Sequence, residues 1–298
     1  MSQAFSISAR RRYGLARLCL YWRVSRATLH RHLSAANRPD APRPRQGPQG
    51  AMSDTDLEER IRTLLADSPF HGEGYRKVWA RLRYAGLRTS PRRVLRVMRE
   101  HNLLAHQRAG SPRGPRAHDG TITTLHVDTM WGTDMTAVAT GEGQAAVFIV
   151  VDHCSAECMG IHASASASRH EALEPIRQGV RRSFGAFGKD VAAVLKIRHD
   201  HGSQYMSRDF QREIRFLGAA SSPAFVRAPE GNGCAERFIR TLKENLLWVR
   251  WFETIEELRQ ALLVFQRTYN EGWLIERHGH RPPAAIREEQ TVINTGAA

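Results

Sequence analysis

The spacing of hydrophobic residues divides the chain into a helical front and a segment that is first β-rich and then mixed. Residues 10–33 predict two short helices around a turn, with Ser25 as the N-cap of the second. This second helix carries Arg26 and Arg31. The pattern is typical of a helix-turn-helix, in which the second helix presents polar and basic groups to a DNA major groove.

A compact basic unit of three helices is predicted over residues 53–104. Two of its helices begin at good capping pairs, Ser53-Asp54 and Ser90-Pro91. The polar faces are rich in arginine, which favours DNA binding over the alternative of a helical bundle that binds no nucleic acid. The candidate DNA contacts of this unit are Arg76, Lys77, Arg92 and Arg93.

From Leu125 the pattern predicts two antiparallel strands, Trp131–Ala139 and Ala145–Asp152, joined by a turn at Gly141–Gly143. Helices and short strands then alternate. The expected elements are a strand at 158–162, a helix at 171–183, a strand ending at Asp200, a helix at 210–217, a strand at 219–222 and a long helix from about Asn232. Antiparallel strands followed by such alternation indicate an α/β layer with a mixed sheet.

Two stretches rich in proline and glycine separate these parts and predict linkers. The predicted domains are a helix-turn-helix-like DNA-binding segment at 1–36, a linker at 37–52, the basic helical DNA-binding unit at 53–104, a linker at 105–121, the α/β core with a C-terminal block at 122–290 and a tail at 291–298.

The distribution of charge sharpens this division. Residues 1–118 carry 24 Lys and Arg against 8 Asp and Glu, whereas the other 180 residues carry 20 against 22. The net charge of +14 therefore comes entirely from the front. A front that binds nucleic acid, joined to a nearly neutral body, is the simplest interpretation, and a basic tail that only aids solubility is the alternative.

Several classes of protein are disfavoured. The chain has no apolar run near the roughly 18 residues of a membrane span, and it starts without the apolar stretch of a secretory signal. Its four cysteines are scattered without CxxC pairs, which indicates neither a disulfide framework nor a zinc knuckle. We therefore expect a cytoplasmic, nucleoid-associated protein with no membrane partner.

Three acidic residues stand out by position. Asp134 lies mid-strand, Asp200 ends a strand, and Glu236 lies early in a helix. A carboxylate within a strand needs a cation, a partner or water to offset its desolvation, and α/β folds place ligands at the C-terminal ends of strands. Any single acid is more often solvated or ion-paired, which is the interpretation for Asp152. These three can converge, and oxygen ligands suit magnesium or manganese rather than zinc.

The spacing of these acids carries a specific resemblance. The segments WGTDMT, RHDHGSQYMS and GNGCAERFIRTLKENL closely resemble the three signature blocks of insertion-sequence transposases in the retroviral-integrase (DDE, ribonuclease H-like) superfamily, of the downstream-frame (orfB) type. As in that family, 35 residues separate Asp200 from Glu236, and a basic residue, Lys243, follows the glutamate by seven positions. Residues 74–100 resemble the family's helical DNA-binding domain and residues 269–286 resemble its C-terminal block.

This resemblance implies a ribonuclease H-like mixed sheet with flanking helices, preceded by small all-α helix-turn-helix modules. It implies metal-dependent DNA cleavage and strand transfer at insertion-element ends. Asp134 would bridge two magnesium or manganese ions, Asp200 would bind one and Glu236 the other, while Lys243 and Arg240 would position DNA phosphates. The implied partners are double-stranded DNA of the element ends and target, and further copies of the chain in a homo-oligomer. Relatives often act fused to an upstream-frame protein, so such a fusion is an implied active form.

The sequence departs from many relatives in one motif, it shows no zinc-binding His/His/Cys/Cys domain like that of retroviral integrases, and other functions remain open. Many relatives carry Asp-Asn where Gly231-Asn232 occurs here, which affects local hydrogen bonding. His199 and His201 flank Asp200, but strand geometry turns their side chains away from its face, so substrate contact or packing is expected over metal binding. The alternative functions are a non-catalytic DNA-binding regulator derived from a transposase and a structure-specific nuclease without joining activity.

Overall fold

A computed structural model describes residues 3–36, 52–105, 122–224 and 232–296. The chain divides into two compact units, residues 1–51 and 52–298. Nearly all of both predicted linkers lies outside the described residues. Across the described part, no helix is long and apolar enough to span a membrane.

The first unit is small and basic, and its predicted helix pair is present. Its elements are β1 (Phe5–Ser6), β2 (Arg11–Arg12), α1 (Leu15–Tyr21) and α2 (Arg26–Ala36). Ser25 caps α2 as predicted, because its hydroxyl accepts a hydrogen bond from the Thr28 amide at 3.1 Å. Leu20, Tyr21 and Trp22 are exposed.

The second unit begins with the predicted three-helix module, formed by α3 (Asp54–Asp67), α4 (Tyr75–Tyr84) and α5 (Pro91–Glu100). Ser53 and Ser90 cap the first and third helices through their hydroxyl groups. The apolar faces of the three helices meet in one core, which includes Leu57, Ile61, Val78, Leu82, Val94, Val97 and Met98.

A five-stranded sheet follows, with the strand order β5-β4-β3-β6-β7. The strands are β3 (Met130–Thr140), β4 (Gly143–Asp152), β5 (Cys158–Ser164), β6 (Lys196–His199) and β7 (Ala220–Pro223). The first three pair antiparallel, while β6 runs parallel to β3 and β7 parallel to β6. This is the ribonuclease H-like mixed sheet, so the predicted fold class is confirmed.

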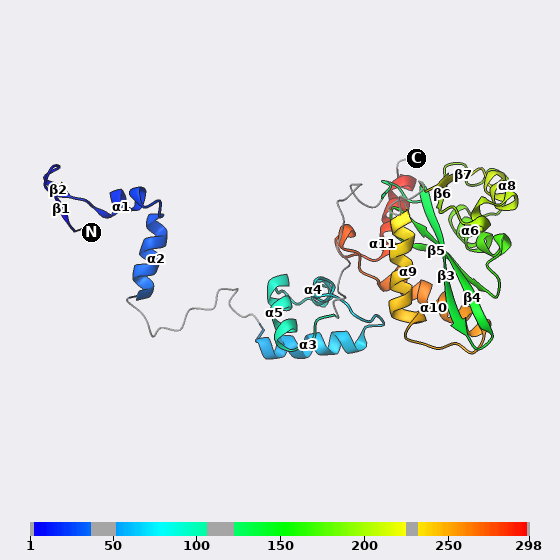
Figure 1. Ribbon diagram of the computed structural model, residues 1–298, viewed down its shortest axis with the longest axis horizontal. Coiled ribbons are helices and arrows are strands. Elements are labelled where there is room, and N and C mark those ends of the chain that lie inside the picture. The colour runs from blue at the N-terminus through cyan, green and yellow to red at the C-terminus, as the bar shows by residue number, and fades with distance from the viewer. Residues whose placement is uncertain (1–2, 37–51, 106–121, 225–231, 297–298) are drawn as a thin grey trace. The chain divides into compact units, whose positions relative to one another are not determined.

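Helices cover both faces of the sheet (Figure 1). One face is covered by α6 (Arg169–Phe184), α7 (Ser203–Met206) and α8 (Arg208–Phe216), and the other by α9 (Gly233–Leu242) and α10 (Ile255–Gly272). Side chains alternate across a strand, so Ile149 packs toward α9 and α10 while Phe148 packs toward α6 and α8. Strand β4 is apolar at both sets of positions because both of its faces are buried.

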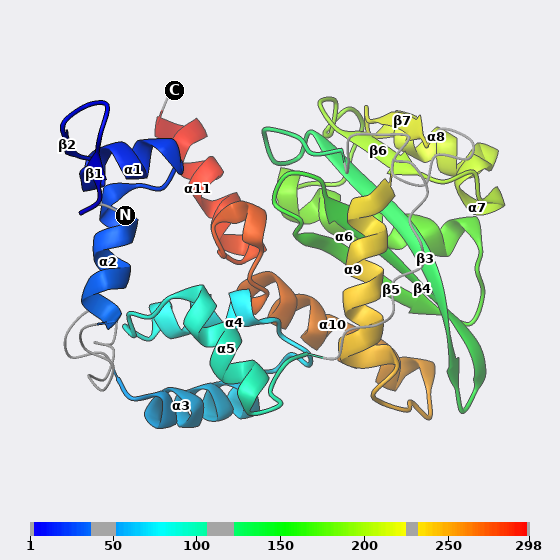
Figure 2. The ribbon, with the colours of Figure 1, turned by 60° about the vertical axis from the view of Figure 1, so that its left-hand side comes forward.

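The C-terminal region differs from the single long helix expected from Asn232. Helix α9 ends in a π-helical turn, η2 (Lys243–Leu247), and α10 follows as a separate helix. Beyond it lie a 3₁₀ turn, η3 (Glu276–His278), and α11 (Pro283–Gly296), which continues past the predicted end of the core at residue 290. Helix α9 runs alongside β3 (Figure 2), and this contact places the third acid near the first.

Candidate active site

Strand register brings the first two acids together. Strands β3 and β6 are parallel neighbours in which Gly132 pairs with Arg198. Two residues further along this register, Asp134 of β3 comes level with Asp200, which directly follows β6. The Asp134 carboxylate accepts a hydrogen bond from the Met135 amide at 2.8 Å. The Asp200 carboxylate accepts one from the Gly202 amide, also at 2.8 Å, in the tight turn that leaves the strand.

Helix α9 supplies the third acid on the same face of the sheet. Its buried side includes Ala235, Phe238 and Leu242. Glu236 and Arg240 lie on the exposed side, and Lys243 is partly buried. The Arg240 guanidinium donates a hydrogen bond to the Glu244 carboxylate at 3.0 Å, so it is already paired within the helix.

The three acids interact electrostatically. The pKa of Asp134 is raised from 3.8 to about 6, chiefly by burial; the negative charges of Asp200 and Glu236 add to the rise, while the Met135 amide and Lys243 oppose it. This oxygen-rich, partly desolvated set has the chemistry that suits a hard divalent cation. Among the described residues, however, no three Asp, Glu, His or Cys side chains are grouped closely enough to hold a metal ion.

His199 is a packing residue at this site. Its ring stacks on Tyr205 with 5.6 Å between centroids, and its two nitrogens lie 2.6 Å from the Asp200 carbonyl oxygen and 2.8 Å from the Ser221 hydroxyl. Both ring nitrogens therefore have protein partners, and neither is directed toward the three acids as a metal ligand would be. Sequence reasoning did not single out Tyr205, which is fully buried; burial raises the pKa of its hydroxyl, and Asp134 and Asp200 add to the shift. Its place in the RHDHGSQY block was the available signal.

The predicted DNA contacts separate into two groups. Arg26, Arg31 and Arg92 are exposed, and Arg76 is exposed but paired with Glu276 at 2.6 Å.

Lys77 and Arg93 are engaged inside the protein. The Lys77 ammonium is buried over the ring of Trp273, and burial lowers its pKa to about 7. Arg93 donates to the Asp54 carboxylate at 2.8 Å and to the Met52 carbonyl, which ties α5 to the start of α3. Arg93 therefore stabilises the module, whereas the Lys77 ammonium lies buried against an aromatic ring and does not present its charge to solvent.

A buried ionic cluster was not anticipated. Asp152, expected to be solvated or ion-paired, is fully buried, as is Glu157. Arg287 of α11 donates to Glu157 and, at 2.6 Å, to Asp128, and it lies 3.9 Å from Asp152. Arg182 of α6 also donates to Glu157. The cluster therefore joins α6 and α11 to the segments that flank β3 and β4.

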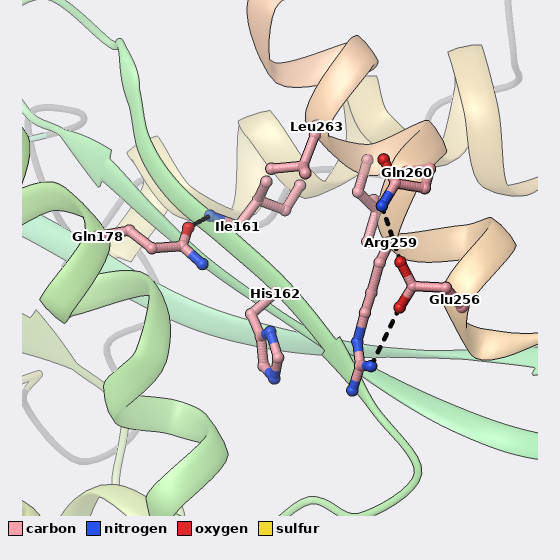
Figure 3. A pocket seen from close by; sticks show the side chains of 8 residues that line it. Ile161, His162, Gln178, Glu256, Arg259, Gln260 and Leu263 are labelled. Carbon is pink, nitrogen blue, oxygen red and sulfur yellow. Dashed lines mark hydrogen bonds and ion pairs between the residues drawn. The ribbon is translucent and has the colours of Figure 1, made fainter.

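A cavity of about 180 Å³ lies at the sheet edge formed by β5 (Figure 3). Side chains there satisfy the edge backbone: the Gln178 carbonyl accepts from the Ile161 amide at 3.0 Å, and Arg259 donates to the Ala163 carbonyl at 2.8 Å. Asn270 bonds both the amide and the carbonyl of Cys158. This edge is thereby protected against strand addition, and none of the three acids lines the cavity.

Known proteins share this organisation. Residues 125–229 and 220–283 match the integrase core domain family, and residues 53–110 match an HTH-like domain.

Transposase InsD of insertion element IS2A/D/F/H/I/K from Escherichia coli is 30% identical over 246 residues, covering 80% of this chain and 78% of the relative. InsD of IS2-9 from Escherichia coli K12 is also 30% identical, covering 80% and 77%. The catalytic core of BIV integrase shows 19% identity with a TM-score of 0.43, covering 56% of this chain and 99% of that one. The InsD matches span most of both chains, and the chain therefore belongs to the insertion-sequence transposases of the retroviral-integrase superfamily.

Proposed function

We propose that Asp134, Asp200 and Glu236 form the phosphoryl-transfer centre with which this transposase cuts and joins DNA. The main support is their placement, since β3, the end of β6 and the start of α9 bring three carboxylates to one face of the sheet. Two bound magnesium or manganese ions would stabilise the attacking and leaving oxygens of the transfer. The amides of Met135 and Gly202 orient the two aspartates for this role.

Basic side chains around the centre and in the front modules would hold the DNA. Lys243 and Arg240 follow Glu236 in the sequence, and we expect both to contact phosphates, with Arg240 exchanging its Glu244 carboxylate for a phosphate oxygen. Residues 1–36 contain seven arginines and no acidic residue, which favours binding to a polyanion. We expect the exposed Arg26, Arg31 and Arg92 to contribute to recognition of element ends.

Two ends must be held together for transposition, so we propose that the chain acts as a homo-oligomer on double-stranded DNA of the element ends and target. We also propose that the chain acts when it is fused to an upstream-frame protein and that it associates with the nucleoid.

The test is cleavage and joining of end-bearing DNA by purified protein with magnesium, beside Asp134→Asn, Asp200→Asn and Glu236→Gln. Each variant should lose at least ~100-fold in both reactions and still bind DNA, because only charge that stabilises the reaction is removed. Asp190→Asn is the matched control: Asp190 is exposed and has a φ of 59°, which asparagine tolerates.

Retained activity in any of the three acid variants would contradict the assignment of that residue. Hydrolysis by the wild type without a joined product would instead indicate a nuclease.

A further inference from the structure

The three-helix module contacts the part of the chain that follows Glu236. Two elements of that part are involved, the π-helical turn η2 and the C-terminal end of α10. We call this contact the dock. Its residues are Phe70, His71 and Arg81 on the side of the module and Asn245, Gly272 and Trp273 on the side of the core.

One part of the dock is aromatic. Phe70 is only 3% exposed, and its ring meets the ring of Trp273 edge to face, with 5.0 Å between the centroids. Trp273 in turn stacks on Tyr269 of α10, at 6.0 Å between centroids. Buried aromatic side chains contribute much of the binding energy in contacts between protein surfaces. Phe70 therefore anchors the module to the end of α10.

A second part of the dock is a charged group held in one orientation. The Glu73 carboxylate is fully buried and accepts two hydrogen bonds from the Arg81 guanidinium, each of 2.8 Å. The same guanidinium donates to the Gly272 carbonyl oxygen at 3.2 Å. A bidentate pair fixes the plane of the guanidinium, so its third bond sets how the module lies against α10 as well as holding it there.

Asn245 connects the dock to the helix that carries Glu236. Its side chain is buried; Nδ2 donates to the Thr241 carbonyl oxygen at 2.9 Å, and Oδ1 accepts from the His71 amide at 2.7 Å. Reversing the amide would oppose two acceptors at Thr241 and two donors at His71, so the orientation is fixed. Because α9 continues directly into η2, Asn245 lies roughly 14 Å along the helix from Glu236.

The dock leaves a basic face of the module exposed. On the module, the residues of the dock lie between Phe70 and Arg81, whereas Arg92 and Arg99 of α5 are exposed. Positions seven apart lie on the same face of a helix. A docked module therefore presents this basic face at a fixed place relative to Glu236.

We propose that the dock sets the distance between the DNA sequence that the module binds and the phosphate that is cut at the three acids, with Asn245 as a positioning residue. A module released from the dock would still bind DNA, but it would no longer hold one phosphate at the acids. Cleavage would then spread over neighbouring phosphates. This role rests on the proposed function of the three acids, whereas the docked arrangement does not.

The docked arrangement is tested by hydrogen exchange at the His71 amide in the full chain, labelled with ¹⁵N at histidine. The signal is identified by its loss in His71→Gln. We expect slow exchange in the wild type and exchange at least ~10-fold faster in Asn245→Ala, which removes the acceptor. Asn245→Asp keeps an acceptor oxygen and should keep the amide protected. Exchange at the rate of a free amide in the wild type, or no acceleration in Asn245→Ala, would overturn the dock.

The positioning role is tested by mapping the cut at nucleotide resolution on a duplex that carries the element's own terminus and its flanking DNA. The wild type should cut mainly at one phosphate. Phe70→Leu and Asn245→Ala should lower the share of cuts at that phosphate at least ~3-fold, because remote contacts that position reacting groups are lost. A variant that is merely less stable would cut less DNA at the same phosphate. Gln260→Ala is the matched control, since this exposed amide of α10 bonds Glu256 at 2.7 Å, twelve residues before Gly272.

An unchanged cut pattern in Phe70→Leu and Asn245→Ala, or no return to the wild-type pattern in Asn245→Asp, would refute the positioning role. If Asn245→Ala does not fold, the pattern of Phe70→Leu decides. Cleavage that survives Glu236→Gln would instead refute the proposed function and leave the docked arrangement in place.

Discussion

Replacing Asp134 with asparagine should stabilise the metal-free protein at neutral pH and remove the response of its stability to magnesium. Burial, followed by the charges of Asp200 and Glu236, raises the pKa of Asp134 from 3.8 to about 6. Between pH 3.8 and about 6, the Asp134 carboxyl therefore holds a proton in the native state that it has already released in the unfolded chain. The free energy of unfolding falls as pH rises through this range, because the unfolded state binds fewer protons than the native state.

The size of the effect follows from the shift. Two pKa units correspond to about 3 kcal/mol, fully expressed above pH 7. Asp134 is only partly buried, so solvent screening reduces the expected gain for Asp134→Asn to about 1–3 kcal/mol. Asparagine keeps an oxygen that can accept the Met135 amide hydrogen bond, so little packing is lost. Magnesium at ~100 times its dissociation constant should stabilise the wild type by about 2.7 kcal/mol, and the variant far less.

The assay is urea unfolding of wild type, Asp134→Asn and the Asp190→Asn control at about pH 5 and pH 8, with and without magnesium. The gain should be full at pH 8 and about half as large at pH 5, because at pH 5 the native carboxyl still holds its proton whereas the unfolded one has largely lost it. A variant less stable than wild type at pH 8, or equal stabilisation of both by magnesium, would show that Asp134 is not a desolvated metal-binding carboxylate.

Three further changes test the packing of the core by urea unfolding. Arg287→Leu should cost about 3–5 kcal/mol because it removes a cation that is paired with Asp128 and with the buried Glu157; a cost below about 1 kcal/mol would contradict this. Gly160→Ala should cost about 1–3 kcal/mol or more, because its Cβ would overlap the α6 backbone, whereas Gly74→Ala meets open space and should leave the core intact. Asn270→Ala should cost about 1–3 kcal/mol and increase self-association in light scattering, since it uncovers backbone groups of the β5 edge; an unchanged monomer signal would argue against edge protection.

The sheet was predictable because its information is local. The alternation of residues 130–140, the apolar run of 143–152 and the glycine turn between them specify a hairpin without reference to the rest of the chain. The break after α9 was not predictable, because a π-helical turn at Lys243–Leu247 and the start of α10 depend on packing against β4 and β5. The spacing of Asp200 and Glu236 pointed to the candidate site, but not to Tyr205, whose burial depends on packing against His199 and Phe210 in the folded chain.

Whether a charged side chain is exposed or buried was the hardest feature to predict from the sequence. Lys77 lies in a basic, arginine-rich stretch and was expected to face DNA, but the ring that covers it lies at Trp273, nearly two hundred residues away in the sequence. A local pattern identifies which face of a helix is polar, whereas the partner that removes a polar group from water is set by the tertiary fold.

Asp134 differs from the carboxylates of the buried ionic cluster in the charges that surround it. This difference distinguishes a structural role from a catalytic one. In the buried ionic cluster the protein supplies the cations itself, since Arg287 and Arg182 donate to Glu157. For Asp134 the charges that act on it are two carboxylates and Lys243, and burial outweighs the help that the ammonium gives. A carboxylate whose pKa is raised to about 6 lowers the stability of the protein at neutral pH, and a bound divalent cation would offset that cost. The electrostatics of Asp134 and the 35-residue spacing of Asp200 and Glu236 therefore favour the same site.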